Sequence, residues 1–511
     1  MNKQEGSFLG HRRAGILLHP TSLPGQSFGD LGPNAYRFVD FLVDSGISVW
    51  QTLPLAPTHN DDSPYNSLSA HAGSPQMISL DLLKEQGWLE LQGEYTGFDD
   101  YHEYRNACLK QAREAFFRQI STADKKSFDE FVVQHDYWIE DYALYQALRV
   151  QFGTHWIDWP AAFRDKQVDF GSFSEGESGA FSGVFSGRTG QETEQQIKDA
   201  VQQALFEQYV FFDQWHALRQ YANERGVLLF GDVPIFVAHD SADVWANRDQ
   251  FFLDEDGIPL VVAGVPPDYF SETGQRWGNP LYNWQLMREE GYQWWVNRMR
   301  TQLELFDLVR IDHFRGFEAY WEIAAECETA MDGHWVKGPG EELFRSLEQR
   351  FGTLPVVAED LGLITPEVTA LREHHGFPGM KILQFAFDGD NENPYLPHNH
   401  EPNSVVYTGT HDNDTTLGWF ESLPEDQRNR VLEYLGCPDE PMPWSLVRAA
   451  FNSIAELAVI PMQDVLALGS AHRMNVPGTT SETNWRWQFS WDQLEAGLAE
   501  KIRLLVVQSE R

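Results

Sequence analysis

The sequence predicts an α/β fold, a (β/α)8 TIM barrel with large, mainly helical insertions on its catalytic face. Eight short apolar runs, rich in β-branched and aromatic residues, recur along the chain and are separated by helical or loop-like stretches. Near-continuous apolar runs are typical of parallel strands that are buried on both faces. Eight of them match the strand count of this barrel, and several end in polar residues, as expected where the C-terminal strand ends carry the chemistry.

The predicted strands, in chain order, are Ala14–Pro20, Ser48–Leu55, Gly226–Val237, Phe306–Phe314, Leu354–Gly362, Met380–Phe387, Ser404–Asp412 and Ala455–Leu466. A ninth candidate, Tyr320–Ala325, means that the strand count alone does not establish the barrel.

Uneven strand spacing predicts the insertions. We expect a barrel core formed by residues 1–55 and 226–511, with smaller insertions at about 239–305 and 315–353. Residues 56–225, between the second and third strands, are expected to form a mainly helical subdomain. Insertions that rise above one face of a barrel predict a deep cleft for an extended substrate.

Helices are predicted within that subdomain over Asp99–Ile120, Ser127–Phe152 and Glu192–Arg225. The last of these places a set of apolar side chains three or four residues apart, on one helical face. They are Ile197, Val201, Leu205, Tyr209 and Phe212. The Gly/Ser-rich stretch 171–190 predicts a flexible loop.

Charge and composition exclude several classes of protein. The chain has 511 residues, and its 38 basic and 76 acidic residues give a net charge of −38. Such a surface does not suit nucleic acid, which normally requires a basic face. The three cysteines are far apart, and no apolar run is long enough for a signal sequence or a membrane span. We therefore expect a soluble, cytoplasmic protein without a nucleic-acid or membrane partner.

Common cofactor and metal motifs are missing from the sequence. It contains no GxxxxGK[ST] loop, no convincing GxGxxG after a strand, no GxSxG and no HExxH. The pairs His374-His375 and His398/His400 lie beside Gly or Pro, which favours solvated turns over metal ligands. The prediction is an enzyme with no metal and no cofactor.

Carboxylates at strand ends remain as candidates for chemistry. Asp312 in VRIDHFRG lies two residues after Arg310, so both side chains point to one face, where the cation would keep the acid ionised. Glu359 in VVAEDLG would enter a partly desolvated pocket, which raises a carboxyl pKa and suits a proton donor. Asp360 faces the other side and is expected to cap the following turn. Asp412 in TGTHDND follows another strand.

Each of these acids also has a purely structural interpretation, an ion pair at the barrel rim for Asp312 and a turn or cap residue for Asp412. Three carboxylates at three strand ends favour a catalytic set. Glycoside cleavage with retention needs a nucleophile and an acid/base about 5–5.5 Å apart, and a third carboxylate could hold sugar hydroxyls as positive charge develops.

Seven long motifs then carry a resemblance to a known family. They are LLHPTSLPG, GDVPIFV, PPDYFSETGQRWGNPLY, VRIDHFRGF, VVAEDLG, GMKILQFAFDGD and TGTHDNDT. Together they resemble the amylomaltases, or 4-α-glucanotransferases, of glycoside hydrolase family 77, from about residue 17 to about residue 487. The resemblance implies an α-amylase-related barrel with inserted subdomains. The stretch 171–190 looks longer than is usual in that family.

The resemblance also implies roles for individual residues. Asp312 matches the nucleophile after the fourth strand, Glu359 the acid/base after the fifth and Asp412 the transition-state stabiliser after the seventh, which places Tyr320–Ala325 in an insertion. The implied substrate contacts are Tyr65, Asp232, Arg310, His313 and His411, and, in a mobile loop over the acceptor sites, Asp268, Phe270, Trp277 and Asn279. Packing against the core is the alternative for Tyr65 and Trp277, and a purely structural role is the alternative for Asp232.

Three functions follow as hypotheses. The first is a glucanotransferase that cleaves an α-1,4 bond, holds a covalent glycosyl group on Asp312, and passes it to the 4-hydroxyl of another sugar. The second is a hydrolase of the α-amylase kind, with water as the acceptor. The third is a catalytically silent glucan-binding protein. The expected partners are maltooligosaccharides and α-1,4-glucans, and the sequence predicts no particular oligomeric state.

Overall fold

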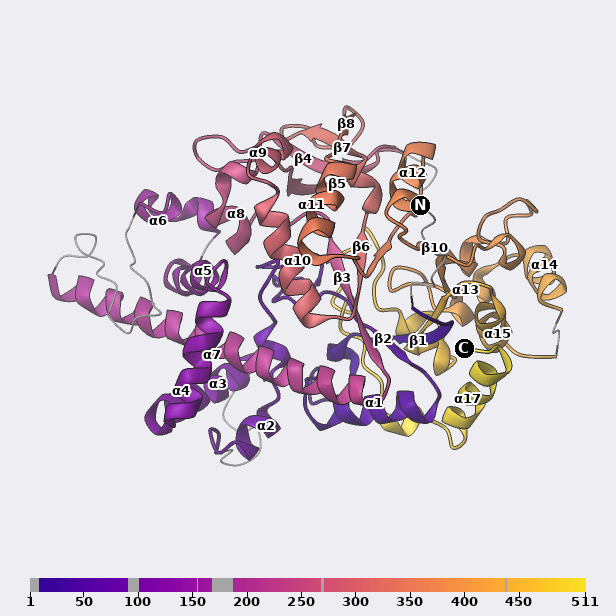
Figure 1. Cartoon of the computed structure of the whole chain (residues 1–511), viewed down its shortest axis with the longest axis horizontal. Coiled ribbons are helices and arrows are strands. Elements are labelled where there is room, and N and C mark those ends of the chain that lie inside the picture. The colour runs from indigo at the N-terminus through magenta and orange to yellow at the C-terminus, as the bar shows by residue number, and fades with distance from the viewer. Residues whose placement is uncertain (1–8, 91–100, 154, 168–186, 268–270, 437–438) are drawn as a thin grey trace.

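The computed structural model describes residues 9–90, 101–153, 155–167, 187–267, 271–436 and 439–511 (Figure 1). Its core is an eight-stranded sheet in which every neighbouring pair that shares a ladder is parallel. The strands are β1 (Arg13–Leu17), β2 (Val49–Gln51), β3 (Leu228–Pro234), β6 (Leu308–Asp312), β9 (Val356–Ala358), β10 (Gly379–Ile382), β11 (Ser404–Tyr407) and β12 (Leu457–Pro461). Each overlaps one of the eight predicted runs, so the predicted barrel is confirmed.

The order of the strands is β10-β11-β12-β1-β2-β3-β6-β9, which leaves β9 and β10 as the two ends of the sheet. The amide of Ala358 on β9 donates to the carbonyl of Pro378, at a distance of 2.9 Å, and draws these two ends together. The barrel is therefore nearly closed. The predicted runs extend beyond most of these strands, because their last residues are the loops of the catalytic face.

Asp360 also joins the two ends of the sheet. Its Oδ1 accepts a hydrogen bond from the amide of Met380 on β10, at 2.7 Å, and its Oδ2 lies 3.2 Å from Nε of Arg372. A Cβ atom on Gly379 would lie only 2.4 Å from this carboxylate, so a glycine is required there. The prediction that Asp360 caps the following turn is wrong, because its side chain bonds across to the next strand.

Helices surround the barrel. They include α1 (Pro33–Asp44), α10 (Gln293–Leu305), α11 (Glu341–Phe351), α12 (Pro366–His374), α13 (Thr416–Ser422), α14 (Glu425–Leu435), α15 (Trp444–Asn452), α16 (Met462–Val465) and α17 (Leu498–Gln508). Helix α10 packs on β3 and β6, and α11 packs on α10. The predicted insertions 239–305 and 315–353 thus each end in a helix that packs beside the barrel.

The segment between β2 and β3 is helical. It contains α2 (Leu80–Glu85), α3 (Tyr101–Gln119), α4 (Thr122–Gln134), α5 (Ile139–Phe152), α6 (Ala161–Arg164) and α7 (Gly187–Glu224). The long α7 packs against α3, α4 and α5 and also contacts α1 and β3. It therefore links the helical segment to the barrel wall, as Figure 1 shows.

Two predictions for this segment need correction. The single helix predicted over Ser127–Phe152 is two helices, because the chain turns after Gln134 and the ring Nδ1 of His135 bonds the carbonyl of Phe131, at 2.8 Å. The loop predicted at 171–190 falls outside the described residues up to 186, and residues 187–190 begin α7. The apolar face predicted for the third helix is confirmed, with four members buried and Tyr209 half-buried.

A second sheet covers one side of the barrel mouth. It is antiparallel, in the order β5-β4-β7-β8, and consists of β4 (Val261–Val265), β5 (Gln275–Pro280), β7 (Ala319–Ala324) and β8 (His334–Lys337). Strands from the two smaller predicted insertions thus pair with each other. The ninth candidate strand, β7, lies in this sheet and not in the barrel, as the resemblance implied, although the sheet itself was not predicted. Two short helices, α8 (Ala242–Ala246) and α9 (Trp284–Glu289), lie on either side of β4 and β5 along the chain. In the described part of the chain, no helix has the length and apolarity to cross a membrane.

Candidate active site

The predicted nucleophile, Asp312, is the last residue of β6 and lies at the mouth of the barrel. Arg310 and Asp312 share one face of the strand, and Arg310 Nη2 donates to Asp312 Oδ1 at 2.8 Å. Arg310 Nη1 donates to Oδ2 of Asp232, at the end of β3, at 2.6 Å. Burial opposes the charge of Arg310, but the two carboxylates outweigh it and raise the pKa of its guanidinium. A permanent cation therefore lies between the two acids.

Glu359 follows β9 and lies next to Asp312. Its Oε2 accepts a hydrogen bond from the backbone amide of His313, at 2.7 Å, and its Oε1 accepts one from the amide of Leu361, at 3.1 Å. His313 adopts a left-handed backbone with φ of 53°, unusual for a non-glycine residue, at the turn that leaves β6. This turn brings the residue after Asp312 into direct contact with Glu359.

The environment of Glu359 favours its protonated form. Burial and the neighbouring Asp312 raise the pKa of Glu359 to about 8, although Arg310 and the amide of His313 act in the opposite direction. At neutral pH this carboxyl group carries its proton, as a general acid requires.

Asp412 lies in the loop after β11, and its surroundings favour the ionised form, in contrast to those of Glu359. Its Oδ1 accepts a hydrogen bond from Nδ2 of Asn475, at 2.7 Å, and its Oδ2 lies 3.3 Å from Nε2 of His411. Burial raises the pKa of this group, but His411, Asn475 and Arg310 outweigh it and lower the pKa of Asp412 to about 2. Asp412 is thus an anion across the physiological range.

Tyr65 and Asp232 continue the hydrogen-bonded group of Arg310 and Asp312 along the mouth of the barrel. The Tyr65 hydroxyl donates to Asp232 Oδ2 at 2.6 Å, and its ring stacks on His411 with centroids 5.0 Å apart. Asp232 is 2% exposed, and its Oδ1 has no hydrogen-bond partner among the described residues. A continuous polar chain therefore runs from Tyr65 through Asp232 and Arg310 to Asp312.

Trp277 and Asn279 lie on the other side of the nucleophile, on β5. The Trp277 ring stands edge-on to the His313 ring, with centroids 4.8 Å apart, and 39% of the tryptophan is exposed. Asn279 uses its amide to bind the carbonyl of Val237, at 2.9 Å. Both line a cavity of about 570 Å³, which β5 shares with helix α5. Asp268 and Phe270 lie outside the described residues.

His313 and the motif residue His19 are held neutral by burial. Burial lowers the pKa of His313 to about 4, and its Nε2 has no hydrogen-bond partner in the described structure. Burial, together with His411, lowers the pKa of His19 to about 3. Both rings can thus donate or accept a hydrogen bond without adding charge to the site.

Three residues that contact Asp412 or Tyr65 were not predicted from the sequence. Asn475 binds the carboxylate of Asp412, Arg473 binds its backbone carbonyl at 2.9 Å, and Trp485 lies 5.8 Å from Tyr65, measured between ring centroids. These residues follow the last barrel strand in a loop without a strand-end signal. His19 lies in the motif LLHPTSLPG and Trp485 in NWRW, at the two ends of the resemblance to the family. These motifs were the only sequence signal that indicated the two residues.

The paired histidines need one correction. His374 and His398 are exposed, as predicted for solvated turns, but His400 is buried and the side chain of His375 is only 2% exposed. His375 Nδ1 lies 3.0 Å from Glu348, and the two ring nitrogens of His400 are bonded to Ser453 and the carbonyl of Tyr395. Within the described ranges, no group of three or more His, Cys, Asp or Glu side chains could hold a metal ion.

This geometry defines a class of protein, a barrel enzyme with three acids that follow the C-terminal ends of its strands, as in other barrels of this kind. The profile of the family described as 4-alpha-glucanotransferase, glycoside hydrolase family 77, matches residues 18–494. The chain belongs to this family, and it is an enzyme that transfers segments of α-1,4-glucans.

Individual relatives can be aligned with this chain over nearly its whole length. A 4-alpha-glucanotransferase of Thermus thermophilus is 47% identical over 98% of this chain and 99% of its own length. One from Synechocystis sp. is 46% identical over 97% of each chain. Among solved structures, an amylomaltase from Streptococcus agalactiae in complex with acarbose aligns over 98% of this chain and 99% of its own, with a TM-score of 0.89 and 35% identity.

Proposed function

We propose that Asp312 is the nucleophile of a retaining double displacement on α-1,4-linked maltooligosaccharides. Its Oδ1 accepts a hydrogen bond from Arg310, and among the described residues no hydrogen bond reaches Oδ2, which leaves that oxygen to point at an anomeric carbon. Arg310 pairs with the carboxylate at 2.8 Å and fixes its orientation. The covalent bond forms between this oxygen and the anomeric carbon, and the bond to the leaving 4-oxygen breaks.

Glu359 supplies the proton for that leaving oxygen. The observation that carries this assignment is the raised pKa of Glu359, in a carboxyl group held by the amide of the residue next to Asp312. Once the proton has left, Glu359 is the base that removes the proton of the incoming acceptor hydroxyl. One group thus serves both half-reactions.

Asp412 stabilises the positive charge at the anomeric carbon. Its low pKa keeps it anionic, and Asn475 and His411 hold the carboxylate in place from either side. Tyr65, stacked on His411, offers an aromatic face to the sugar whose bond is cleaved, and the unpaired Oδ1 of Asp232 is available to a sugar hydroxyl.

The acceptor binds over Trp277 and Asn279, beside His313. The cavity there is large enough for more than one sugar ring, and the indole face provides a stacking surface. A sugar stacked on Trp277 would lie beside His313, the residue after Asp312, and would displace water from that side of the nucleophile, which favours transfer over hydrolysis.

The test is incubation of the purified protein with maltotriose alone, in the presence of a chelator. We expect glucose and a ladder of longer maltooligosaccharides, with a constant number of reducing ends and no effect of the chelator. Reducing ends that rise without a ladder would show hydrolysis instead, and an Asp312→Asn variant with full turnover would contradict the assignment of the nucleophile.

A further inference from the structure

A second, smaller cavity lies outside the proposed catalytic cleft. It has a volume of about 160 Å³ and opens between α8, the N-terminal end of α5 and the N-terminal end of α10. It shares no lining residue with the cavity beside Trp277. Its floor is formed by the buried residues His71, Trp138 and Asp243, and its mouth by the exposed residues Glu290 and Gln293.

The lining excludes an anionic ligand. Among the described residues that line it, none is a lysine or an arginine. Three are acidic, namely Asp141, Asp243 and Glu290, so a phosphorylated or carboxylated ligand would be repelled.

The same acids do not form a cation site. Asp141 already pairs with Lys166, whose Nζ lies 2.5 Å from Oδ1, and Glu290 accepts a hydrogen bond from Gln250 at 2.8 Å. Burial raises the pKa of Asp243 only to about 6, so this acid is still mostly ionised at pH 7, but its Oδ2 already accepts a hydrogen bond from the amide of Ala70. The polar groups of the cavity are therefore suited to a neutral ligand with hydroxyl groups.

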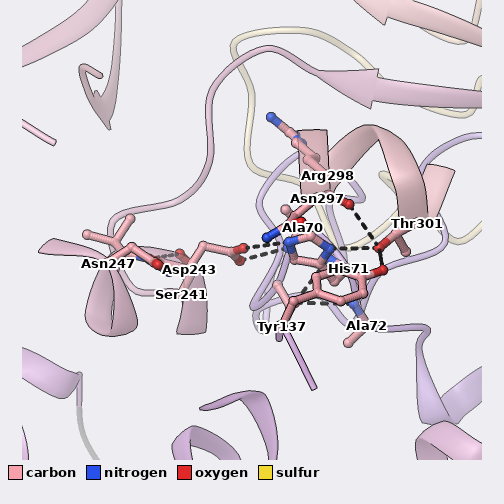
Figure 2. Close-up of polar contacts among 12 residues, drawn as sticks. Ala70, His71, Ala72, Tyr137, Ser241, Asp243, Asn247, Asn297, Arg298 and Thr301 are labelled. Carbon is pink, nitrogen blue, oxygen red and sulfur yellow. Dashed lines mark hydrogen bonds and ion pairs between the residues drawn. The ribbon is translucent and has the colours of Figure 1, made fainter. Parts of the chain in front are cut away.

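The floor of the cavity leaves a gap between two polar atoms. Asp243 Oδ2 accepts a hydrogen bond from the amide of Ala70 at 2.8 Å, and His71 Nδ1 lies 2.8 Å from Thr301 Oγ1 (Figure 2). The remaining atoms, Asp243 Oδ1 and His71 Nε2, are 3.8 Å apart, beyond hydrogen-bond distance. Burial lowers the pKa of His71 to about 3, so the ring is neutral. A single hydroxyl group can bridge the two atoms.

The walls of the cavity are aromatic. Tyr137, Trp138, Tyr142 and Trp294 line it, together with amides that include Asn247 and Asn297. Flat apolar faces combined with amide and carboxyl groups fit the two surfaces of a sugar ring, its C–H faces and its hydroxyl edge.

The volume sets the size of the ligand. At 160 Å³ the cavity is smaller than the roughly 300–1,000 Å³ of sites for drug-sized molecules. It would hold about five water molecules at about 30 Å³ each. One six-membered ring with its hydroxyl groups occupies a comparable space.

We propose that this cavity is a second sugar site, which binds one neutral hexose such as D-glucose outside the catalytic cleft. The assignment does not depend on the proposed roles of Asp312, Glu359 and Asp412. If disproportionation of maltotriose releases glucose, one product of the reaction would also bind at this second site.

The test compares D-glucose binding by calorimetric titration to the wild-type protein and to two variants. Ala246 lines the cavity from the half-buried face of α8, so Ala246→Leu fills it from a helical position. Ala449→Leu makes the same change at a half-buried position of α15, away from this cavity, and is the matched control. We expect Ala246→Leu to lose one glucose site or at least tenfold in affinity, with maltotriose turnover unchanged, and Ala449→Leu to bind like the wild type.

Equal glucose binding by Ala246→Leu and the wild type would overturn the proposal. It would also be overturned if glucose 6-phosphate bound equally well at this site, or if the Tris cation displaced glucose from it. Should Ala246→Leu fail to fold, a crystal of the wild-type protein soaked in D-glucose decides the matter. The proposal requires a sugar ring against Trp138 and Asp243, and an empty cavity at a saturating concentration would contradict it.

Discussion

Glu359 and Asp412 are two carboxylic acids at the mouth of one barrel, and their surroundings give them opposite protonation states. Burial raises the pKa of both groups. At Glu359 the nearby Asp312 adds to that effect and brings the pKa to about 8, whereas at Asp412 the ring of His411 and the amide of Asn475 reverse it and bring the pKa to about 2. Neighbours, rather than burial alone, thus separate a proton donor from a permanent anion.

The largest effect is expected from Asp312→Asn, because it removes the nucleophile and also the charge that raises the pKa of Glu359. Turnover of maltotriose should fall by on the order of 10⁴-fold or more. The pKa of Glu359 should fall as well, which a carboxyl titration of the variant would detect. An unchanged pKa would mean that burial alone sets it.

Glu359→Gln should reduce turnover by about 10²- to 10⁴-fold, as expected when a general acid is lost. In the wild type, kcat/KM should decline as the pH rises through about 8, because the donor loses its proton there. A donor such as α-maltosyl fluoride, whose leaving group needs no proton, should restore formation of the glycosyl-enzyme in Glu359→Gln. A variant that stays equally inactive with this donor would show that Glu359 has another role.

Asn475→Ala tests the opposite member of the pair. Loss of the hydrogen bond to Asp412 should raise the pKa of Asp412 and move the acidic limb of the kcat/KM profile to higher pH. Turnover should fall about tenfold, typical of a hydrogen bond to a charged group. Asn484→Ala is the matched control, since Asn484 bonds Val476 and Thr479 in the same loop without contact to Asp412. Equal losses in the two variants would indicate a loosened loop instead.

The smallest effect is expected from Tyr65→Phe. The change removes the hydroxyl bonded to Asp232 but keeps the ring that stacks on His411. We expect KM for maltotriose to rise about fivefold, as for the loss of one hydrogen bond of about 1 kcal/mol, with kcat nearly constant. A large fall in kcat would show that the polar chain from Tyr65 to Asp312 acts on the reaction itself.

The sequence predicted those parts of the molecule that leave a local signal. Buried parallel strands leave apolar runs, so the eight barrel strands and the positions of Asp312, Glu359 and Asp412 after them could be found. The bond from Asp360 to the next strand leaves no such signal, because it depends on which two strands meet when the barrel closes.

Contacts made from remote loops were equally invisible. Asn475 reaches Asp412 from 63 residues further along the chain, and neither residue type marks the pair. The environment of His375 could not be predicted for the same reason. Its local sequence is typical of a turn, and its contact with Glu348 on α11 forms only in the folded chain. Environment, and hence pKa, is a property of the folded site.

The most direct test of the contrast between Glu359 and Asp412 is an infrared difference spectrum between the wild type and Glu359→Gln as a function of pH. We expect the band of a protonated carboxyl group in the wild type at pH 7, lost as the pH rises through about 8. A spectrum without that band at pH 7 would mean that Glu359 is ionised, and it would contradict its role as the proton donor.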